Sequence, residues 1–365
     1  MGQRLSLEAK ELNFTPTLAV ASALERLGRT EDLQFSADGR KLAIAGFDQS
    51  RLLIVDLHFE TKTHKMIASD FLEVTSPNLQ LPHGLSWINN TTIIVANRIG
   101  DLTVFQLPKR KPASRYVHLK PMATIGRAEF AELNSPGSVS VTEISKNQFE
   151  ILVCNNYAHM ISRHELDMRK GFSIKNQSVY LKARLDVPDG VVHSSSGRFI
   201  GVSNHNGKCV HIYDRRKTLN AASLPSGTLT GLGYPHGLRF SEDERFLFVA
   251  DAAQPFVHVY FDNKAQWLGE NQPVTAIRVM DDAAFIRGQV NPEEGGPKGL
   301  ALSRDNSILA VTCEEAPLTF YDIRSLLSTE SFPAFVKPEF PKLPEKPRQG
   351  LWQRAWKFCR GKLKV

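Results

Sequence analysis

Short runs of alternating apolar and polar residues recur along the chain, and each is followed by a turn and a more apolar run. Six such units align, beginning at residues 31, 83, 136, 189, 236 and 298. Each unit predicts a short alternating strand, a turn such as SADGR or SEDER, a strand rich in Val, Ile and Phe, and a third strand. The stretches between units, such as TKTHKMIASDFLEV and QPVTAIRVMDD, predict a fourth strand.

The spacing between the units is typical of propeller blades. Successive units start 52, 53, 53, 47 and 62 residues apart, and four-stranded units of this period bury their faces only by stacking on neighbours. We therefore predict an all-β, six-bladed β-propeller with four-stranded antiparallel blades over residues 1–336. Prolines interrupt the chain after Ile323, so residues 17–27 are expected to supply the last strand of blade six and close the ring. A degenerate seventh blade is the alternative, but no unassigned segment outside the tail is long enough.

A glycine opens five of the six units, in four of them within a P-x-G-Φ pattern, and Asp32 takes its place in the first. The glycines are Gly84, Gly137, Gly190, Gly237 and Gly299. Innermost strands crowd around the axis of a propeller, so a residue without a Cβ is expected there for packing. We interpret these glycines as structural.

The residue before each glycine is expected to face the axis at one end of the tunnel. In chain order these residues are Glu31, His83, Pro136, Asp189, His236 and Lys298. Loops after the second strand of each unit are expected to bring a second tier to the same mouth: Asp48, Asn97, Asn155, Asn204, His205, Asp251 and Glu314.

Carboxylates and imidazoles that converge on one axis can hold a divalent metal or carry out acid/base chemistry. We predict Glu31, Asp189 and His236 as ligands of one divalent ion, calcium or zinc, and His83 and His205 as the residues that move protons. The candidates for contact with a bound ligand are Asn97, Asn155, Asn204, Asp251 and Lys298. A polar mouth without chemistry is the alternative, because the ends of solvent-filled channels are polar in any propeller.

The P-x-G-Φ start with an S-x-D-x-R-x-Φ turn, as in PHGLRFSEDERFLFVAD and PDGVVHSSSGRFIGVSN, resembles the six-bladed propellers of the NHL-repeat and gluconolactonase-like groups over residues 31–323. In gluconolactonase-like enzymes a Glu of the first blade and Asn or Asp of later P-N-G and P-D-G motifs hold a catalytic divalent ion. The resemblance implies this role for Glu31 and Asp189. His236 stands where that family has a second oxygen ligand, and Glu31 lacks the family's flanking motif. His83 and His236 also resemble two zinc-binding histidines of a related propeller lyase.

Motifs of several other enzyme classes are absent from the sequence, which has no G-x-S-x-G, P-loop or H-E-x-x-H. The spacing of three cysteines matches no metal-binding motif. They are Cys154, Cys209 and Cys313, and we expect them to pack within strands as reduced thiols. His164 falls in an outer segment, where a surface position is expected.

The C-terminal residues 337–365 change the distribution of charge. They carry nine Lys or Arg and two Glu, a net charge of +7 that equals the +7 of the whole chain. The propeller itself is therefore close to neutral, and no nucleic-acid partner is expected. After a proline-rich spacer, a stripe of Trp352, Trp356, Cys359 and Leu363 predicts a short basic amphipathic helix. It suits an anionic membrane surface, an acidic groove or docking on the propeller.

The chain has no apolar stretch near the ~20 residues that cross a bilayer and no secretory signal pattern at its start. We expect a cytoplasmic protein with peripheral membrane contact through the tail, to which the myristoylation pattern at Gly2 and Ser6 would add a second anchor. Three functions stay open: a propeller that binds a small molecule or a protein at the tunnel mouth, a metal-dependent hydrolase or lyase, and a scaffold tethered by its tail.

Overall fold

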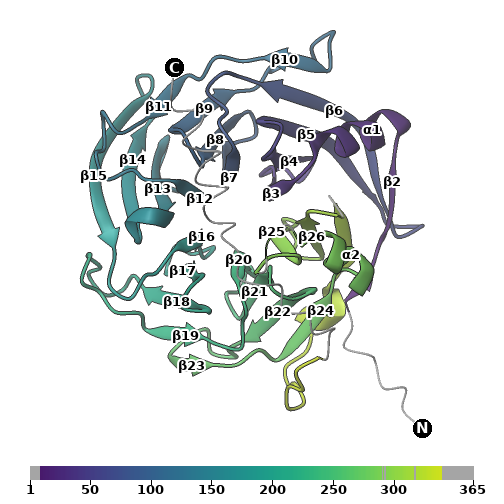
Figure 1. The fold of residues 1–365 in the computed structure, drawn as a ribbon, viewed down its shortest axis with the longest axis vertical. Helices are drawn as coiled ribbons and strands as arrows, with labels where there is room; N and C mark the ends of the chain where they lie inside the picture. Colours follow the sequence, from purple (N-terminus) through teal and green to yellow (C-terminus); the bar gives the residue numbers. More distant parts are fainter. Residues whose placement is uncertain (1–8, 290, 292, 316–317, 339–365) are drawn as a thin grey trace.

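Six small sheets stand in a ring around a central axis (Figure 1). The computed structural model describes residues 9–289, 291, 293–315 and 318–338. The chain builds one blade after another around the ring, so the predicted six-bladed β-propeller is confirmed. The amphipathic segment of the tail and the Gly2 pattern lie outside the described residues.

Each blade is a sheet whose strands run outward from the axis in chain order. In the first three blades these strands are β3 (Thr30–Phe35), β4 (Lys41–Gly46), β5 (Arg51–Glu60) and β6 (Lys65–Thr75); β7 (Pro82–Asn89), β8 (Thr92–Asn97), β9 (Leu102–Gln106) and β11 (Ala123–Ile125); and β12 (Pro136–Ser145), β13 (Gln148–Asn155), β14 (Met160–Asp167) and β15 (Ser173–Leu181).

The other three blades repeat this order. Their strands are β16 (Pro188–His193), β17 (Phe199–Asn204), β18 (Cys209–Asp214) and β19 (Gly227–Leu229); β20 (Pro235–Phe240), β21 (Phe246–Asp251), β22 (Phe256–Phe261) and β24 (Thr275–Arg278); and β25 (Pro297–Leu302), β26 (Ile308–Cys313) and β27 (Thr319–Asp322) with β1 (Lys10–Glu11).

Further short elements lie at the rim or in loops. They are the edge strands β2 (Asn13–Pro16), β10 (Tyr116–His118) and β23 (Gly269–Asn271), the helices α1 (Leu18–Leu27), α2 (Asp282–Arg287) and α3 (Arg324–Leu327), and the 3₁₀ turn η1 (Asn156–Ala158).

The ring is closed by an N-terminal strand, as predicted, but not by the segment that we expected. The strand is β1, which pairs antiparallel with β27, and the Leu12 amide donates a hydrogen bond to the Phe320 carbonyl (2.8 Å). Residues 17–27, predicted as a strand, instead form α1. The Thr17 side chain caps the helix by accepting a hydrogen bond from the Val20 amide, and apolar side chains on one face are buried.

The core lies between the blades. The second strands β8, β17, β21 and β26 are buried at every position, because one set of side chains packs against the preceding blade and the other against the following blade. This is why these strands are continuous apolar runs in the sequence.

The glycines near the axis are structural, as predicted. A Cβ built on Gly84 would lie 2.6 Å from the Ser138 Cα of the next blade, and one on Gly299 would lie 2.7 Å from the Asp32 Cα. Neighbouring inner strands therefore touch backbone to backbone, and this close approach brings the residues that precede the glycines together around the axis.

The structure tests three further expectations, on the cysteines, on His164 and on membrane-spanning helices. Cys154, Cys209 and Cys313 are buried thiols, as predicted for strand packing. The prediction of a surface position for His164 is wrong. Its side chain is fully buried in blade three, where its two ring nitrogens form hydrogen bonds with Ser162 and Gln177. Among the described residues, none of the helices is long and apolar enough to cross a membrane.

Candidate functional site at the tunnel mouth

The second residues of five inner strands gather at one end of the propeller axis. Glu31, His83, Asp189, His236 and Lys298 are each at most 4 % exposed, although each carries an ionisable group. Burial of ionisable side chains is costly unless they are paired. Their mutual contacts are therefore the first feature of the site to establish.

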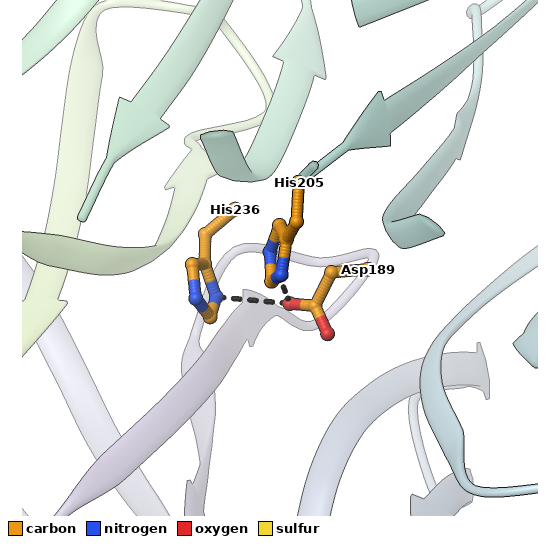
Figure 2. A group of neighbouring side chains, drawn as sticks. All are labelled: Asp189, His205 and His236. Carbon is orange, nitrogen blue, oxygen red and sulfur yellow. Dashed lines mark ion pairs between the residues drawn. The ribbon is translucent and has the colours of Figure 1, made fainter. Parts of the chain in front are cut away.

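Asp189 is the centre of the cluster, and its two carboxylate oxygens have different partners. Oδ1 accepts a hydrogen bond from Asn156 Nδ2 (2.6 Å) and one from the Arg98 guanidinium (3.2 Å). Oδ2 lies 2.9 Å from His236 Nδ1 and 3.3 Å from His205 Nε2. Figure 2 shows the two imidazoles converging on this oxygen.

Asp189, His205 and His236 form a compact set of metal-binding donor atoms. All three side chains are buried, and one donor atom from each lies within 4.8 Å of the other two. The His205 and His236 rings are 4.6 Å apart between centroids. Neither ring nitrogen of His205, nor Nε2 of His236, has a hydrogen-bond partner with good geometry among the described residues.

The two imidazoles differ in their protonation. Burial would lower the pKa of His236, but the charge and hydrogen bond of Asp189, with help from Glu294, raise it to about 9. Burial lowers the pKa of His205 despite the nearby Asp189. Burial alone would raise the pKa of Asp189, yet the surrounding imidazoles hold it well below its ordinary value. Asp189 is thus an anion that faces one charged and one neutral imidazole.

His83 approaches the same centre from blade two with a fixed ring orientation. Its Nδ1 lies 2.7 Å from the Gly137 carbonyl, which can only accept, so Nδ1 carries the hydrogen and Nε2 is the free base. Nε2 lies 3.5 Å from Glu31 Oε2 and 3.9 Å from Asp189 Oδ1. Burial, and to a smaller extent the charge of Arg98, lower the pKa of His83 to about 4. The ring is therefore neutral near pH 7.

Glu31 belongs to an ionic network beside the His/Asp cluster. Its Oε1 accepts from Arg29 and from Lys298 (3.2 Å), while its buried Oε2 has no hydrogen-bond partner among the described residues. Glu294 also binds Lys298 (2.7 Å) and lies 3.5 Å from the Arg29 guanidinium. Burial would raise the pKa of Glu31, but Arg29 and Lys298 lower it to about 2. Glu31 lies outside the three-residue metal set and is neutralised by these two cations.

The asparagines and the aspartate of the second tier serve the blades themselves. Each ends its second strand and accepts a hydrogen bond from the backbone of the segment leading into the inner strand of the same blade. The donor amides are Gln80 for Asn97, Asn134 for Asn155, Asp186 for Asn204, and both Gly233 and Tyr234 for Asp251. The side-chain amides of Asn97, Asn155 and Asn204 also donate hydrogen bonds within their own blades. Among the described residues, these side chains therefore stabilise the blades.

The next residue in the chain, rather than the strand-ending residue, turns toward the axis. Successive side chains of an extended chain point to opposite sides, so the residues that follow the strand ends reach the centre. Arg98, Asn156 and His205 contact Asp189, and Glu314 lies 3.6 Å from Arg29. Phe47 packs edge-on against His83. Of the predicted second tier, His205 and Glu314 are therefore in contact with the central cluster, whereas Asp48 is exposed.

Sequence reasoning missed four contributors to the cluster. Arg98 and Asn156 follow predicted positions by one residue, so a strand boundary shifted by one would have identified them. Arg29 precedes Glu31 by two residues and Glu294 precedes Lys298 by four. These two lie outside the repeat pattern, and only the spacing of opposite charges could have suggested them.

Comparisons with known proteins support the fold. A comparison with protein families finds no match, and a comparison with curated proteins finds none either. Among solved structures, a luciferin-regenerating enzyme aligns with a TM-score of 0.52 at 12% identity, over 81% of this chain and 92% of that one. A functionally unknown protein from Desulfotomaculum acetoxidans DSM 771 aligns with a TM-score of 0.48 at 13% identity, over 80% of this chain and 85% of that one. At 12% identity the likeness to the luciferin-regenerating enzyme supports the propeller fold and nothing finer.

Proposed function

We propose that this protein is a metal-binding propeller, which holds one divalent transition-metal ion with Asp189, His205 and His236 and binds a small ligand at the tunnel mouth. The observation that supports the proposal is the convergence of one carboxylate and two imidazoles within 4.8 Å in a buried site. Three imidazole nitrogens, both of His205 and Nε2 of His236, make no hydrogen bond of good geometry among the described residues. They support the proposal further, since buried polar atoms are normally satisfied.

The chemistry of the donors favours zinc or a similar ion over calcium. Two nitrogen donors and one oxygen donor match catalytic zinc sites, which use three protein ligands and leave a fourth position open. Calcium takes six to eight oxygen ligands, and only Asp189 among the three residues provides oxygen. Because Arg98 and Asn156 bind Oδ1 of Asp189, they leave Oδ2 directed at the imidazoles, as second-shell partners of a ligand do.

The pairing of His83 with Glu31 favours a ligand that donates a hydrogen bond. With the hydrogen on Nδ1, the Nε2 of His83 is an acceptor, and it faces the unpartnered Oε2 of Glu31 at 3.5 Å. Two acceptors at this distance are stable together only with a donor or a cation between or beside them. A ligand hydroxyl would satisfy both atoms.

A metal-dependent hydrolase or lyase is the second candidate, and the geometry of His83 favours it. Its neutral imidazole presents a free Nε2 to the cluster, 3.9 Å from Asp189 Oδ1. A neutral base beside a metal ion can take a proton from a bound water or from a substrate carbon. His83 would move the proton in this reaction, and His205 would serve as a ligand of the ion.

Metal analysis of the full chain tests the proposal. Protein stripped with a chelator and titrated with Zn²⁺ is expected to bind one equivalent tightly. Asp189→Asn, His205→Gln and His236→Gln are each expected to weaken this binding by at least ~100-fold, since each removes a direct ligand. His159→Gln is the matched control, because His159 lies 3.2 Å from Asp186 in an exposed pair that would bind zinc only adventitiously.

The outcomes separate the candidates. If His159→Gln removes the tight equivalent, or if the three cluster variants bind zinc as the unsubstituted protein does, the proposal is wrong. For the second candidate, zinc-loaded protein is assayed for hydrolysis of aldonolactones by proton release. His83→Gln is expected to abolish turnover and keep the bound zinc, and turnover that survives this substitution would exclude His83 as the base.

A further inference from the structure

The end of the tunnel opposite the metal site holds a cavity of about 390 Å³. Its walls come from residues of the six inner strands and from the turns that follow four of these strands. Gln34, Ser86, Ser140, His193, Arg239 and Leu302 represent the six blades in this lining. The volume falls in the range of small-molecule pockets.

Ser140, His193 and Glu150 form a chain of hydrogen bonds at the wall of this cavity. Ser140 Oγ lies 2.8 Å from His193 Nδ1, and His193 Nε2 lies 3.1 Å from Glu150 Oε1. Ser140 and His193 come from the facing inner strands β12 and β16 and are each 9% exposed, while Glu150 is fully buried. Both Ser140 and His193 line the cavity.

The donors and acceptors of this chain have one consistent assignment. The Glu150 carboxylate can only accept, so His193 Nε2 carries the hydrogen. Nδ1 is then an acceptor, and it receives the hydrogen of the Ser140 hydroxyl. The His193 amide donates to Ser140 Oγ (3.1 Å), which holds the hydroxyl oxygen in place with its hydrogen turned to the ring. The imidazole is thus set to take the proton of Ser140.

Two arginines bind Glu150 and fix its position. Arg163 donates to Oε2 and the Arg215 guanidinium lies 2.7 Å from Oε1. Burial would raise the pKa of Glu150, but His193, Arg215 and Arg163 lower it to about 2. Burial lowers the pKa of His193, with smaller effects of the same sign from the two arginines. His193 is therefore a neutral base near pH 7, and Glu150 orients it.

We propose that Ser140 is a nucleophile activated by His193, with Glu150 as the positioning residue, and that this opposite mouth is a second site, which takes a small carboxylic ester. The arrangement has the roles of a serine–histidine–carboxylate triad, which recurs on unrelated folds and is recognised by geometry rather than by motif. The Ser86 hydroxyl and the Arg239 guanidinium line the same cavity and are donors of the kind that stabilise an oxyanion.

The reaction balances within these residues, the ester and water. Ser140 Oγ forms a bond to the ester carbon while its proton passes to His193 Nδ1. The carbon–oxygen bond to the alcohol breaks, and His193 returns the proton to the leaving alkoxide. Water then attacks the acyl-Ser140, His193 takes the proton of that water, and the carboxylic acid leaves as Ser140 recovers its hydrogen.

Labelling with an alkyl fluorophosphonate tests the proposal on the full chain in the presence of a chelator, so the result is independent of the metal site. A bond forms between Ser140 Oγ and phosphorus, fluoride leaves, and His193 takes the proton. Peptide mass spectrometry is expected to find one phosphonyl group, on Ser140. His193→Gln is expected to slow this labelling by at least ~100-fold, the usual contribution of a general base.

Four further variants complete the experiment. Ser138→Ala is the matched control, since Ser138 lies on the same strand and its hydroxyl accepts a hydrogen bond from the Val191 amide (3.3 Å) rather than bonding a histidine. Glu150→Gln keeps an oxygen that can accept from His193 and is expected to retain labelling, whereas Glu150→Ala is expected to lose it. If His193→Gln does not fold, Ser140→Cys gives a second readout. Peptide mapping should show that iodoacetamide alkylates the new thiol far faster than the buried Cys154, Cys209 and Cys313.

The proposal is overturned if the folded protein leaves Ser140 unlabelled, or if His193→Gln labels at the unsubstituted rate. An unreactive thiol in Ser140→Cys would overturn it as well.

Discussion

Replacing Asp189 by asparagine should destabilise the protein strongly in the absence of metal. Asp189 is 2 % exposed at its side chain and is the ion-pair partner of Arg98 and His236. Asparagine keeps the shape and one acceptor oxygen but removes the charge, so the buried His236 and the partly buried Arg98 lose their anionic partner. Removal of one partner of a buried pair costs ~3–5 kcal/mol. Unfolding entropy of ~2.1 cal/mol/K per residue amounts to ~0.8 kcal/mol/K for a chain of this size, so the expected fall in Tm is ~4–6 °C.

Urea unfolding followed by tryptophan fluorescence, with chelator present, measures this effect. Asp56→Asn is the control, because the Lys41–Asp56 pair has a similar length (2.8 Å) but is about 40 % exposed on both sides, and such surface pairs contribute only ~0–1 kcal/mol. The double variant Asp189→Asn with Arg98→Gln should lose at least ~1 kcal/mol less stability than the sum of the losses of the two single variants, because it also removes the guanidinium that Asp189→Asn leaves unpaired. A loss below ~1 kcal/mol for Asp189→Asn, or strict additivity in the pair, would refute the reasoning.

Three further predictions follow from the same structure. Gly84→Ala should lower the free energy of unfolding by ~1–3 kcal/mol, because its Cβ would meet the backbone of the next blade at 2.6 Å. Gly100→Ala should cost less, since its Cβ would meet the flexible Gln80 side chain. Chemical denaturation compares the two variants, and equal losses would contradict the crowding argument. Burial lowers the pKa of His164 to about 4, below the ~6.5 of the unfolded chain. The unfolded state therefore binds the proton more readily between these values, and the stability gained from neutral His164 is complete above pH ~6.5 and lost as the pH falls toward 4. His164→Gln should lack this part of the pH dependence, and parallel stability–pH curves for the two proteins would exclude the effect. Deletion of residues 337–365, with their nine Lys or Arg, should abolish sedimentation with anionic vesicles, and vesicle binding that survives the deletion would rule out the tail as the membrane contact.

The blade repeat was readable from the sequence because each unit carries the same local signals. Turns such as SADGR and apolar second strands fix the strand boundaries within each blade, and the recurrent glycines mark the start of the inner strands. The position before each glycine was therefore predictable. Glu31, His83, Asp189, His236 and Lys298 meet at the axis because the glycines let neighbouring inner strands touch.

The closing strand was not readable in the same way. β1 is only two residues long, which is too short for an alternating pattern to mark it. The segment that we expected to close the ring has helical signals: Thr17 as N-cap, Gly28 at the C-terminal end, and buried Val20, Leu24 and Leu27 on one face. We predicted a strand because this segment stands before the first unit, where the fourth strand of a blade is expected. Its local sequence pattern favours a helix, and the segment forms a helix.

The inner contacts of the site depend on details that a repeat pattern does not contain. A shift of one residue at a strand end decides whether Asn97 or Arg98 faces the axis, and sequence patterns locate strand ends only to within a few residues. Glu294 lies in a loop without a counterpart in the other blades, so its contact with Lys298 could not be inferred. The chain of Ser140, His193 and Glu150 likewise joins two blades through residues that no motif marks.

X-ray diffraction at the zinc absorption edge, on crystals of the full chain soaked with Zn²⁺, tests the central proposal most directly. We predict one strong anomalous peak at the tunnel mouth, within bonding distance of the Asp189 carboxylate and of the His205 and His236 rings. An anomalous map without a peak there, with His236 Nδ1 still paired to Asp189 Oδ2, would contradict the metal-binding propeller.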